Sequence, residues 1–463
     1  MTGLRKLTLL FLPILLFISG CKSGENNPVE STGNENVFIQ YGTPFQAVPE
    51  TKDIVMYEIN QRAFSASGDF RGIINRLDSI KALGINVIWL MPVFPIGELK
   101  SAGEMGSPYS VRNYREVNPE FGNLADLREL VTKAHDRGMA VILDWVANHT
   151  AWDNPWISNK DWYTQDGAGN IIHPQGTNWL DVADLNYSNA EMRKAMINAM
   201  KYWVYEANID GFRCDVADMV PADFWKQVRD SLAGIPGRKL IMLAEGSRWD
   251  HFTSGFQLNY AWDFYGKLKD VFRAGQSAAN LKSVNISEYD FMPAGLHKLR
   301  FTTNHDESAW DDSPVNLFGG LRGSMAAFVT AIFMRGVPLV YAGQETGRSA
   351  KTPFFSRSPI DWNANPEIVN EYRQLLNVRS SNEVFKQGSV EYMLTSDVVC
   401  FTRKSGNQEA LVIVNVRNRA VGFTLNQSLQ NTLWKNLLTG ADYSAGTQIS
   451  LGNYEYLILL RTV

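Results

Sequence analysis

The chain has 463 residues, which is long enough for one large domain and a smaller one. Its net charge of −4 provides no basic surface of the kind that binds nucleic acid. Its three cysteines are too few for a disulfide framework, and no Cys-x-x-Cys or clustered Cys/His spacing indicates a zinc site.

The N-terminus is typical of a targeting segment. Two basic residues precede the apolar run 7–18, which is too short to span a membrane comfortably. The ending Ile18-Ser-Gly-Cys21 resembles the lipobox of bacterial lipoproteins. The resemblance implies cleavage before Cys21 and lipidation of its sulfur, so that residues 1–20 form a lipoprotein signal peptide. A plain signal peptide and a short membrane anchor are the alternatives.

Residues 21–49 are predicted to form a tether and an N-terminal segment. Positions 22–36 are rich in Gly, Asn, Ser and Glu, a composition typical of flexible linkers. We expect the mature protein to be held at a membrane by the lipid on Cys21. It would then lie in the cell envelope, in the periplasm or at the cell surface.

Strand-like and helix-like runs alternate from residue 50 to residue 379. This alternation predicts a parallel sheet, and eight such units predict a (β/α)8 barrel. The predicted strands lie at 53–60, 86–91, 139–144, 209–215, 239–245, 260–264, 299–303 and 338–341, and the predicted helices at 72–83, 124–135, 190–206, 221–232, 321–335 and 365–378.

Three segments depart from this alternation. The loop 93–123 contains Tyr109, and loops of this length in compact domains are often functional. Residues 150–188 lack clear periodicity, which predicts a small insertion after the third strand, over the mouth of the barrel. Residues 380–463 are predicted to form an antiparallel C-terminal β-sandwich domain, from short β-like runs at 390–402, 410–416, 420–424 and 454–460.

Acidic residues stand at the C-terminal side of several predicted strands. They are Asp144, Asp215, Glu245 and Asp306. In a closed parallel barrel the C-terminal ends of all strands open on one face, where catalytic groups gather. We therefore expect these carboxylates to converge, although they are distant in sequence.

Arg213 and Asp215 are two positions apart in the predicted strand 209–215, so their side chains share a face. Because a nearby guanidinium lowers a carboxyl pKa, we expect Arg213 to hold Asp215 ionised. An ionised carboxylate at the end of a buried strand is suited to act as a nucleophile. The alternative is a partly buried structural ion pair.

Several motifs resemble the α-amylase family of glycoside hydrolases, family 13, in that family's order. They are Asp144-Trp-Val-Ala-Asn-His149, Val182-Ala-Asp-Leu-Asn186, Gly211-Phe-Arg-Cys-Asp215, Leu243-Ala-Glu245 and Asn304-His-Asp306. The resemblance implies a retaining mechanism in which Asp215 attacks the anomeric carbon and Glu245 acts as acid and then base. It also implies that Asp306 holds sugar hydroxyls. Crowding by Asp215 and Asp306 is expected to raise the pKa of Glu245.

The same resemblance implies further substrate-binding residues. Tyr109 resembles the family's sugar-stacking tyrosine, with packing alone as the alternative. His149 and His305 are expected to donate hydrogen bonds to sugar hydroxyls. Arg213 and Asp144 complete the predicted substrate site, Asp144 by orienting Arg213 or His149.

The chain departs from the family at Asp218 and Met219, where α-amylases usually carry Lys-His. The departure leaves open which sugars bind beyond the cleavage point, and it weakens the family's calcium site. Asn148 and Asp184 still offer hard oxygen ligands, so calcium at these two residues is an open alternative. No cofactor is required for the chemistry. The tryptophans of the insertion are expected to divide between its core and the substrate: Trp152, Trp156, Trp162 and Trp179.

We expect a cell-envelope lipoprotein that hydrolyses α-1,4-glucosidic bonds in starch-like glucans or maltooligosaccharides with retention. The alternatives are an α-glucosidase, a cyclodextrin hydrolase or a transglycosylase of the same family, because loops set specificity on this fold. A non-catalytic glucan-binding lipoprotein is a further alternative. The expected partners are the glucan and, through Cys21, a membrane, while the oligomeric state stays open.

Overall fold

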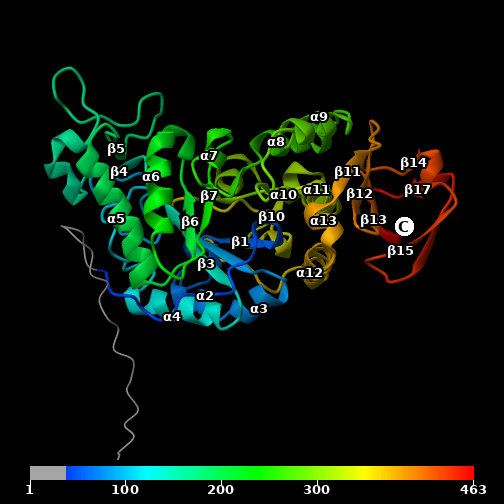
Figure 1. Cartoon of the computed structure of the whole chain (residues 1–463), viewed down its shortest axis with the longest axis horizontal. Helices are drawn as coiled ribbons and strands as arrows, with labels where there is room; N and C mark the ends of the chain where they lie inside the picture. The colour runs from blue at the N-terminus through cyan, green and yellow to red at the C-terminus, as the bar shows by residue number, and fades with distance from the viewer. Residues whose placement is uncertain (1–37) are drawn as a thin grey trace, which may run out of the picture.

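The computed structural model describes residues 38–463, so the predicted signal peptide, Cys21 and the tether up to residue 37 lie outside the described residues. The described chain forms a closed barrel followed by a C-terminal β domain, and the two lie end to end (Figure 1). No helix among residues 38–463 combines the length and the apolar character needed to cross a membrane.

The strands of the barrel close in the order β1-β10-β9-β8-β7-β6-β3-β2, and all neighbouring pairs are parallel. The prediction of a (β/α)8 barrel is therefore confirmed. The strands are β1 (Met56–Ile59), β2 (Val87–Leu90), β3 (Ala140–Trp145), β6 (Gly211–Cys214), β7 (Ile241–Ala244), β8 (Leu258–Tyr260), β9 (His297–Arg300) and β10 (Val337–Tyr341).

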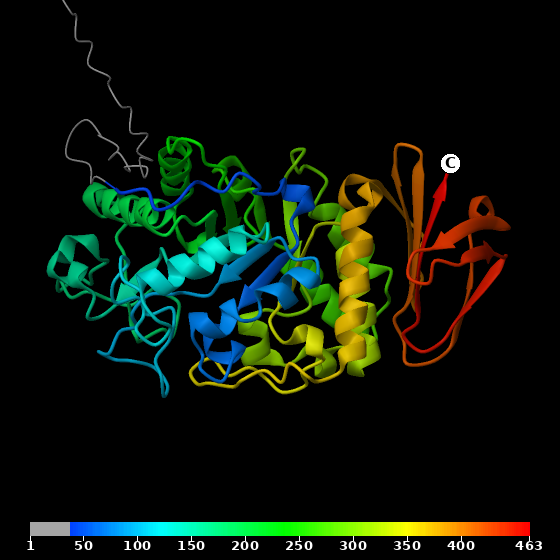
Figure 2. The ribbon, with the colours of Figure 1, turned by 90° about the horizontal axis from the view of Figure 1, so that it is seen from below.

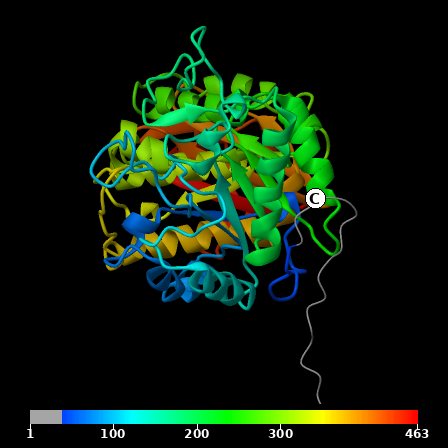
Figure 3. The same ribbon diagram turned by 90° about the vertical axis from the view of Figure 1, so that its left-hand side faces the viewer.

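Helices lie around the outside of the barrel (Figure 3). Helix α5 begins after Asn189, whose side chain accepts hydrogen bonds from the backbone of Glu191 and Met192. The helices are α1 (Gln61–Phe64), α2 (Phe70–Ile74), α3 (Leu77–Ala82), α4 (Leu124–His135), α5 (Ala190–Glu206), α6 (Ala222–Ala233), α7 (Asp250–Thr253), α8 (Trp262–Phe272), α9 (Asn280–Ser287), α10 (Pro314–Leu317), α11 (Gly320–Met334), α12 (Pro366–Ser381) and α13 (Glu383–Gln387).

The segment between β3 and α5 contains a short antiparallel pair and two 3-10 turns. Strand β4 (His149–Ala151) pairs with β5 (Val182–Asp184), so that His149 lies opposite Asp184. The turns η2 (Pro155–Ser158) and η3 (Lys160–Trp162) lie between them in the chain. This segment supplies one wall of the cavity described below.

The C-terminal domain contains a six-stranded antiparallel sheet in the order β11-β12-β13-β18-β15-β16 and a two-stranded sheet, β14-β17. Figure 2 shows the long helix α12 between the barrel strands and this domain. The strands are β11 (Ser389–Tyr392), β12 (Val398–Ser405), β13 (Gln408–Asn415), β14 (Val421–Thr424), β15 (Thr432–Asn436), β16 (Asp442–Ala445), β17 (Gln448–Leu451) and β18 (Tyr456–Thr462).

The sixth barrel strand was predicted at 260–264, which is wrong. The strand is β8, Leu258–Tyr260, and helix α8 begins at Trp262. A strand of three residues carries no readable pattern. Phe264, the last residue of the predicted strand, is instead part of the buried face of α8.

Two other predicted elements are each two elements in the structure. The predicted helix 72–83 is α2 followed by α3, because Arg76 leaves helical geometry at φ −115° and ψ 5°. The apolar periodicity continues across this break, which hides it in the sequence. The predicted run 390–402 is an antiparallel pair, β11 and β12, joined by a turn. Strands β15, β16 and β17 were not predicted, because they are partly exposed and carry few apolar residues in a row.

Candidate active site

A cavity of about 570 Å³ opens at the C-terminal ends of the barrel strands. Its lining includes the three predicted catalytic carboxylates and three of the predicted substrate-binding residues: Asp215, Glu245, Asp306, Tyr109, His149 and His305. Arg213 and Asp144 are fully buried and do not line the cavity. The structure therefore places these two to orient other groups, as predicted for Asp144, whereas Arg213 was grouped with the substrate-binding residues.

Arg213, on β6, faces three carboxylates. Its Nη1 donates hydrogen bonds to Asp144 Oδ1 at 2.8 Å and to Asp215 Oδ1 at 2.9 Å. Its Nη2 lies 2.8 Å from Glu245 Oε2, but the N–H bonds of Nη2 are not aimed at a described acceptor. Of the carboxylates, Asp144 and Asp215 therefore accept hydrogen bonds from Arg213, and Glu245 receives only the attraction of its charge. The Nε of Arg213 donates to the Tyr260 hydroxyl at 3.3 Å.

The pKa of Asp215 is raised well above its ordinary value. Burial is the main cause, Arg213 opposes it, and the charges of Glu245, Asp144 and Asp306 raise the pKa further. The prediction that Arg213 gives Asp215 a low pKa is wrong, because burial outweighs a guanidinium that three carboxylates share. The pKa of Glu245 is raised as predicted, with burial rather than crowding as the largest cause.

Val216 fixes one oxygen of Glu245. It follows Asp215 with φ 36° and ψ 46°, in the left-handed region that β-branched residues rarely adopt. In this conformation its backbone N–H donates to Glu245 Oε2 at 2.7 Å. Backbone strain of this kind persists where the surrounding structure requires it and is concentrated at active sites.

His305 is held between Glu58 and Tyr109. Its Nδ1 lies 2.5 Å from Glu58 Oε1, and its Nε2 lies 2.7 Å from the Tyr109 hydroxyl and 3.3 Å from Asp306 Oδ2. Burial by itself lowers the pKa of His305, but the charges of Asp306 and Glu58 outweigh it and raise the pKa to about 9. The imidazole is therefore protonated at neutral pH, and both ring nitrogens are donors.

Tyr109 connects His305 to Asp144. Its hydroxyl accepts from the protonated His305 and donates to Asp144 Oδ2 at 2.9 Å. Trp89 Nε1 donates to the same oxygen at 3.1 Å. Asp144 therefore accepts from Tyr109, Trp89 and Arg213, and its role is to position these groups under the cavity.

His149, on β4, is neutral at physiological pH, because burial lowers its pKa to about 4. Its ring lies beside Trp179, with 5.6 Å between centroids. Of the insertion's tryptophans, Trp179 is the one that lines the cavity in the described structure. The other three, Trp152, Trp156 and Trp162, are partly buried and pack against the core.

Asn148 and Asp184 are the residues predicted as possible calcium ligands. The Asn148 amide lies 3.3 Å from His149 Nδ1. Burial raises the pKa of Asp184, although a hydrogen bond with Thr164 opposes the shift. Within residues 38–463, no three His, Cys, Asp or Glu side chains gather into a group that could hold a metal. Calcium takes six to eight oxygens from side chains, backbone carbonyls and water, so Asn148 and Asp184 would supply only two of them.

Asp218, which stands where the family usually has lysine, anchors the segment after Glu245. Its carboxylate accepts hydrogen bonds from the backbone of Ser247 at 3.2 Å and of Arg248 at 3.3 Å. Gly246 has φ 148°, and a Cβ there would lie 2.5 Å from the Asp218 carboxyl group. At the position where the family usually has lysine, Asp218 therefore makes a structural contact with the segment after Glu245.

A row of aromatic rings leads from Tyr109 to the solvent-exposed edge of the cavity. Centroid distances are 5.8 Å from Tyr109 to Phe354, 5.4 Å from Phe354 to Trp310 and 5.1 Å from Phe354 to Phe355. Trp310 lies in the π-helical turn η5 (Glu307–Asp311) and is 61% exposed. We call Tyr109, Phe354, Phe355 and Trp310 the aromatic row. An exposed indole beside a polar cavity suits a ligand with flat apolar faces.

Six residues of this site were not predicted from the sequence: Glu58, Trp89, Val216, Trp310, Phe354 and Phe355. A signal existed for Glu58, an acidic residue inside the apolar first strand, where a buried charge needs a partner. Phe354 and Phe355 lie in an irregular segment without periodicity, and no pattern indicated them.

Comparison with known proteins assigns the chain to a family. The family described as "Alpha amylase, catalytic domain" matches residues 31–387. "Alpha-amylase 3" of Dictyoglomus thermophilum is 25% identical, with 82% of this chain and 88% of that protein covered. A cyclomaltodextrinase of Thermoanaerobacter pseudethanolicus is 28% identical, with 78% of this chain and 65% of that protein covered.

Among solved structures, a noncanonic maltogenic α-amylase, AmyB, from Thermotoga neapolitana superposes with a TM-score of 0.80 at 30% identity. The match covers 89% of this chain and 99% of that one. An α-amylase from Lactobacillus plantarum also has a TM-score of 0.80, at 25% identity, with 89% and 99% covered. With its closed barrel, its cavity lined by three carboxylates and these matches, the chain belongs to the α-amylase family of glycoside hydrolases.

Proposed function

We propose that this protein hydrolyses α-1,4-glucosidic bonds in starch-like glucans or maltooligosaccharides with retention of configuration. The observation that carries the proposal is that Asp215 and Glu245 lie against neighbouring nitrogens of one guanidinium, that of Arg213. This arrangement suits the roughly 5–5.5 Å between carboxyl groups that a retaining mechanism requires, rather than the wider spacing of inverting enzymes.

The hydrogen bonds of Arg213 distinguish the roles of the two carboxyl groups. Their pKa values are both raised, so that the pair retains a proton that one carboxyl group alone would lose. Arg213 donates to Asp215 and stabilises its anion, whereas Glu245 lacks this bond and carries the proton. Asp215 is therefore the nucleophile and Glu245 the acid.

In the first step, Asp215 attacks the anomeric carbon while Glu245 passes its proton to the glycosidic oxygen, so that the bond to the leaving sugar breaks. A covalent glycosyl-enzyme remains. In the second step, Glu245 takes a proton from water, the water oxygen attacks the anomeric carbon, and Asp215 is released. Val216 holds Glu245 Oε2 in both steps, which leaves Oε1 for the proton.

Asp306 and His305 act on the same sugar ring. Both line the cavity beside Tyr109, and His305 is held as a cation. A cationic donor and a carboxylate together bind vicinal hydroxyls, and these hydrogen bonds strengthen as positive charge develops on the ring. Tyr109 offers its ring to the apolar face of that sugar.

The substrate class follows from the relatives and from the aromatic row. Proteins named α-amylase, cyclomaltodextrinase, trehalose-6-phosphate hydrolase and probable oligo-1,6-glucosidase are among the relatives, and the first two names support an α-linked glucan as substrate. The aromatic row extends the cavity beyond Tyr109 and suits a chain of several sugars rather than a single unit.

The test is product analysis on amylose, maltotriose and cyclodextrin with wild-type protein and Asp215→Asn. We expect reducing sugars of retained configuration from wild type, and a loss of kcat of about a thousand-fold or more in the variant. Oligosaccharide binding should persist in the variant. Asp311→Asn, a change in η5 away from the cavity lining, is the matched control.

Hydrolysis by Asp215→Asn within about ten-fold of wild type would contradict the proposed nucleophile. Glucan binding without hydrolysis by wild type would instead support the non-catalytic alternative. The product pattern separates the remaining specificities, because an α-glucosidase releases single glucose units and a transglycosylase lengthens maltotriose.

We infer further that the protein is a lipoprotein of the cell envelope, anchored through Cys21. The inference rests on the apolar run 7–18 and the ending Ile18-Ser-Gly-Cys21. Expression in a bacterial host with labelled palmitate should label wild type and leave Cys21→Ser unlabelled and released from the membrane fraction. Equal labelling of both proteins would contradict lipidation at this residue.

A further inference from the structure

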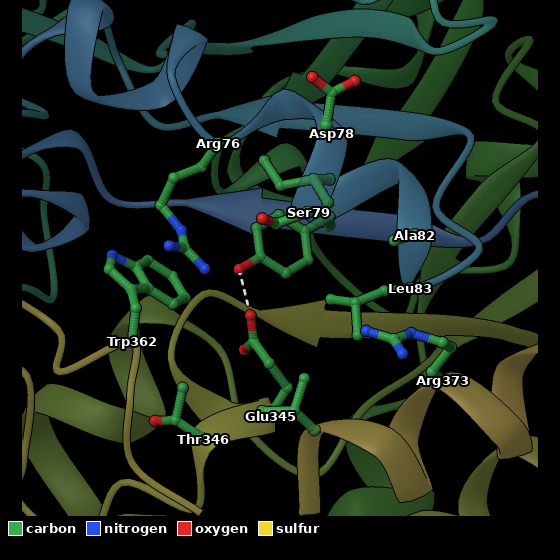
Figure 4. Close-up of a pocket in the computed structure, with 12 residues that line it drawn as sticks. Arg76, Asp78, Ser79, Ala82, Leu83, Glu345, Thr346, Trp362 and Arg373 are labelled. Carbon is green, nitrogen blue, oxygen red and sulfur yellow. Dashed lines mark hydrogen bonds between the residues drawn. The ribbon is translucent and has the colours of Figure 1, made fainter. Parts of the chain in front are cut away.

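A second pocket lies outside the barrel wall between α3 and α12. It has a volume of about 360 Å³ and shares no lining residue with the catalytic cavity. Its lining includes Tyr57 on β1 and Glu345 on η6 (Gln344–Thr346). Figure 4 shows Glu345 with Arg76, Trp362 and Arg373 around the pocket. We call it the α3–α12 pocket.

Two guanidinium groups point into this pocket from opposite sides (Figure 4). The Arg76 guanidinium lies over the ring of Trp362, 4.0 Å from its centroid, and forms no hydrogen bond or ion pair with a side chain or backbone group of residues 38–463. Arg373 donates from Nη1 to Asn370, but its Nε is buried without a described partner. A buried N–H without an acceptor costs free energy, so Arg373 Nε is suited to a ligand that accepts hydrogen bonds. The Arg76 guanidinium faces the same pocket with its own donors.

The acidic residues near the pocket are already engaged. Glu345 accepts from the Tyr57 hydroxyl at 2.5 Å and from the Gly343 backbone at 2.9 Å. Asp78, at the rim, forms a two-pronged ion pair with Arg137, with Nε–Oδ1 at 2.8 Å. One buried carboxyl group therefore faces two guanidinium groups, and the pocket carries a surplus of positive charge.

The remaining walls are largely apolar. Ile80 and Leu83 from the α3 side and Val369 from α12 line the pocket together with the indole of Trp362. The volume falls at the lower end of the range for small-molecule sites, which are mostly apolar with a few placed polar groups. A ligand that fits has a compact apolar body and one charged end.

We propose that the α3–α12 pocket binds a compact organic anion, with a phosphate or carboxylate group between Arg76 and Arg373 and an apolar body against Ile80, Leu83 and Val369. Guanidinium groups bind these oxyanions through two parallel hydrogen bonds, and stacking on Trp362 holds Arg76 in place for this. The site shares no lining residue with the catalytic cavity and does not depend on the proposed glucan activity.

The test is isothermal titration calorimetry of the full chain with phenyl phosphate, benzoate, inorganic phosphate and phenol. We expect phenyl phosphate or benzoate to bind. The one with the higher affinity shows whether the pocket prefers a phosphate or a carboxylate group. Phenol should bind about ten-fold more weakly or not at all, because it lacks the charge. Inorganic phosphate should also bind more weakly, because it lacks the apolar body.

Variants assign the binding to this pocket. Arg76→Gln and Arg373→Gln should each raise the dissociation constant of the tighter-binding anion about ten-fold. Ala82→Trp, a change at the exposed pocket mouth, should abolish binding by filling it. Arg419→Gln in the C-terminal domain removes an exposed charge elsewhere and should leave binding unchanged.

Two outcomes would overturn the proposal. The first is no binding of either organic anion at ten millimolar, or binding of phenol as tight as that of phenyl phosphate. The second is binding that Arg76→Gln, Arg373→Gln and Ala82→Trp all leave unchanged. Excess maltooligosaccharide should not compete with the anion; competition would place the anion in the catalytic cavity and also reject the proposal.

Discussion

At the scale of single residues, one guanidinium organises the catalytic cavity. Arg213 is fully buried and reaches Asp144, Asp215 and Glu245 from one strand. A single cation cannot keep all three carboxyl groups ionised, so one proton remains on the Asp215–Glu245 pair and is available for transfer. The same sharing explains why the Arg213-x-Asp215 spacing alone wrongly predicted a low pKa for Asp215.

His305 links the active site to the stability of the fold. Its pKa is raised from 6.5 to about 9 in the folded state, because Asp306 and Glu58 outweigh the effect of burial. This contribution to stability is complete below pH 6.5, where His305 is protonated in both states. It is lost as the pH rises through 9, because the folded protein then also loses the proton.

We therefore expect the stability difference between wild type and His305→Gln to shrink by about 3 kcal/mol between pH 6 and pH 10. Urea unfolding at both pH values measures it. Glu58→Gln removes one of the two stabilising charges and should show a smaller loss over the same interval. A difference between wild type and His305→Gln that is independent of pH would show that His305 keeps its ordinary pKa.

Trp310 is expected to determine the response to substrate length. It lies two ring-to-ring steps from Tyr109 along the aromatic row and is largely exposed. Trp310→Ala should raise KM for maltoheptaose about three- to ten-fold with kcat little changed, because stacking energy is lost equally in the ground and transition states.

Maltotriose, which is shorter than the row, should be affected less by the Trp310 change. Trp249→Ala is the matched control, because Trp249 is 44% exposed and does not line the cavity. Equal effects of Trp310→Ala on both substrates would place the indole outside the path of the glucan.

At the scale of elements, the helices begin where side chains satisfy their first backbone N–H groups. In α4, Asn123 Oδ1 accepts from the backbone of Ala125 at 2.8 Å and Asp126 at 3.2 Å, and Asp126 accepts in return from the Asn123 backbone. This capping box stands in the sequence as Asn followed three residues later by an acid. It explains why the predicted bounds of α4, 124–135, coincide with the observed ones.

Asn123→Ala should lower the free energy of unfolding by about 1 kcal/mol, because two N–H groups lose their acceptor. Asn123→Asp keeps an acceptor at the same place and should be nearly neutral. Thermal unfolding of the three proteins measures the difference. A loss in Asn123→Asp as large as that in Asn123→Ala would mean that Asn123 acts through something other than the cap.

At the scale of the whole molecule, arginines of the C-terminal domain join it to the barrel by binding helix ends. Arg403, on β12, donates to the carbonyls of Phe333 and Met334 at the end of α11 and to Gly388 after α13. Arg417 donates to the Val271 carbonyl at the end of α8. Cations are stabilised at helix C-termini, where unpaired carbonyls gather.

Arg403→Met should destabilise the protein by about 3 kcal/mol or more, because the variant leaves three buried carbonyls without donors. Lys404→Met, at the neighbouring exposed residue of the same strand, is the control and should cost less than about 1 kcal/mol. Denaturant unfolding followed by tryptophan fluorescence reports both. A small loss in Arg403→Met would show that the carbonyls find other donors and that the domain is held by its apolar contacts.

The sequence by itself determined what depends on neighbours along the chain. Alternating periodicity specified the barrel, and acids at strand ends specified Asp215, Glu245 and Asp306, because the geometry of a parallel barrel brings those ends to one face. Long helices with caps were located closely, whereas the three-residue strand β8 and the break at Arg76 carry no periodic signal.

Only the tertiary structure decided what depends on contacts between distant segments. Closing the barrel brought Glu58 to His305, and it placed Asp144, Asp215 and Glu245 around one arginine. Burial cannot be read from the sequence of a single strand. It raised the pKa of Asp215 and outweighed the lowering expected from Arg213. Through-space charge and desolvation act over all residues that folding brings together, and for that reason local pattern cannot encode them.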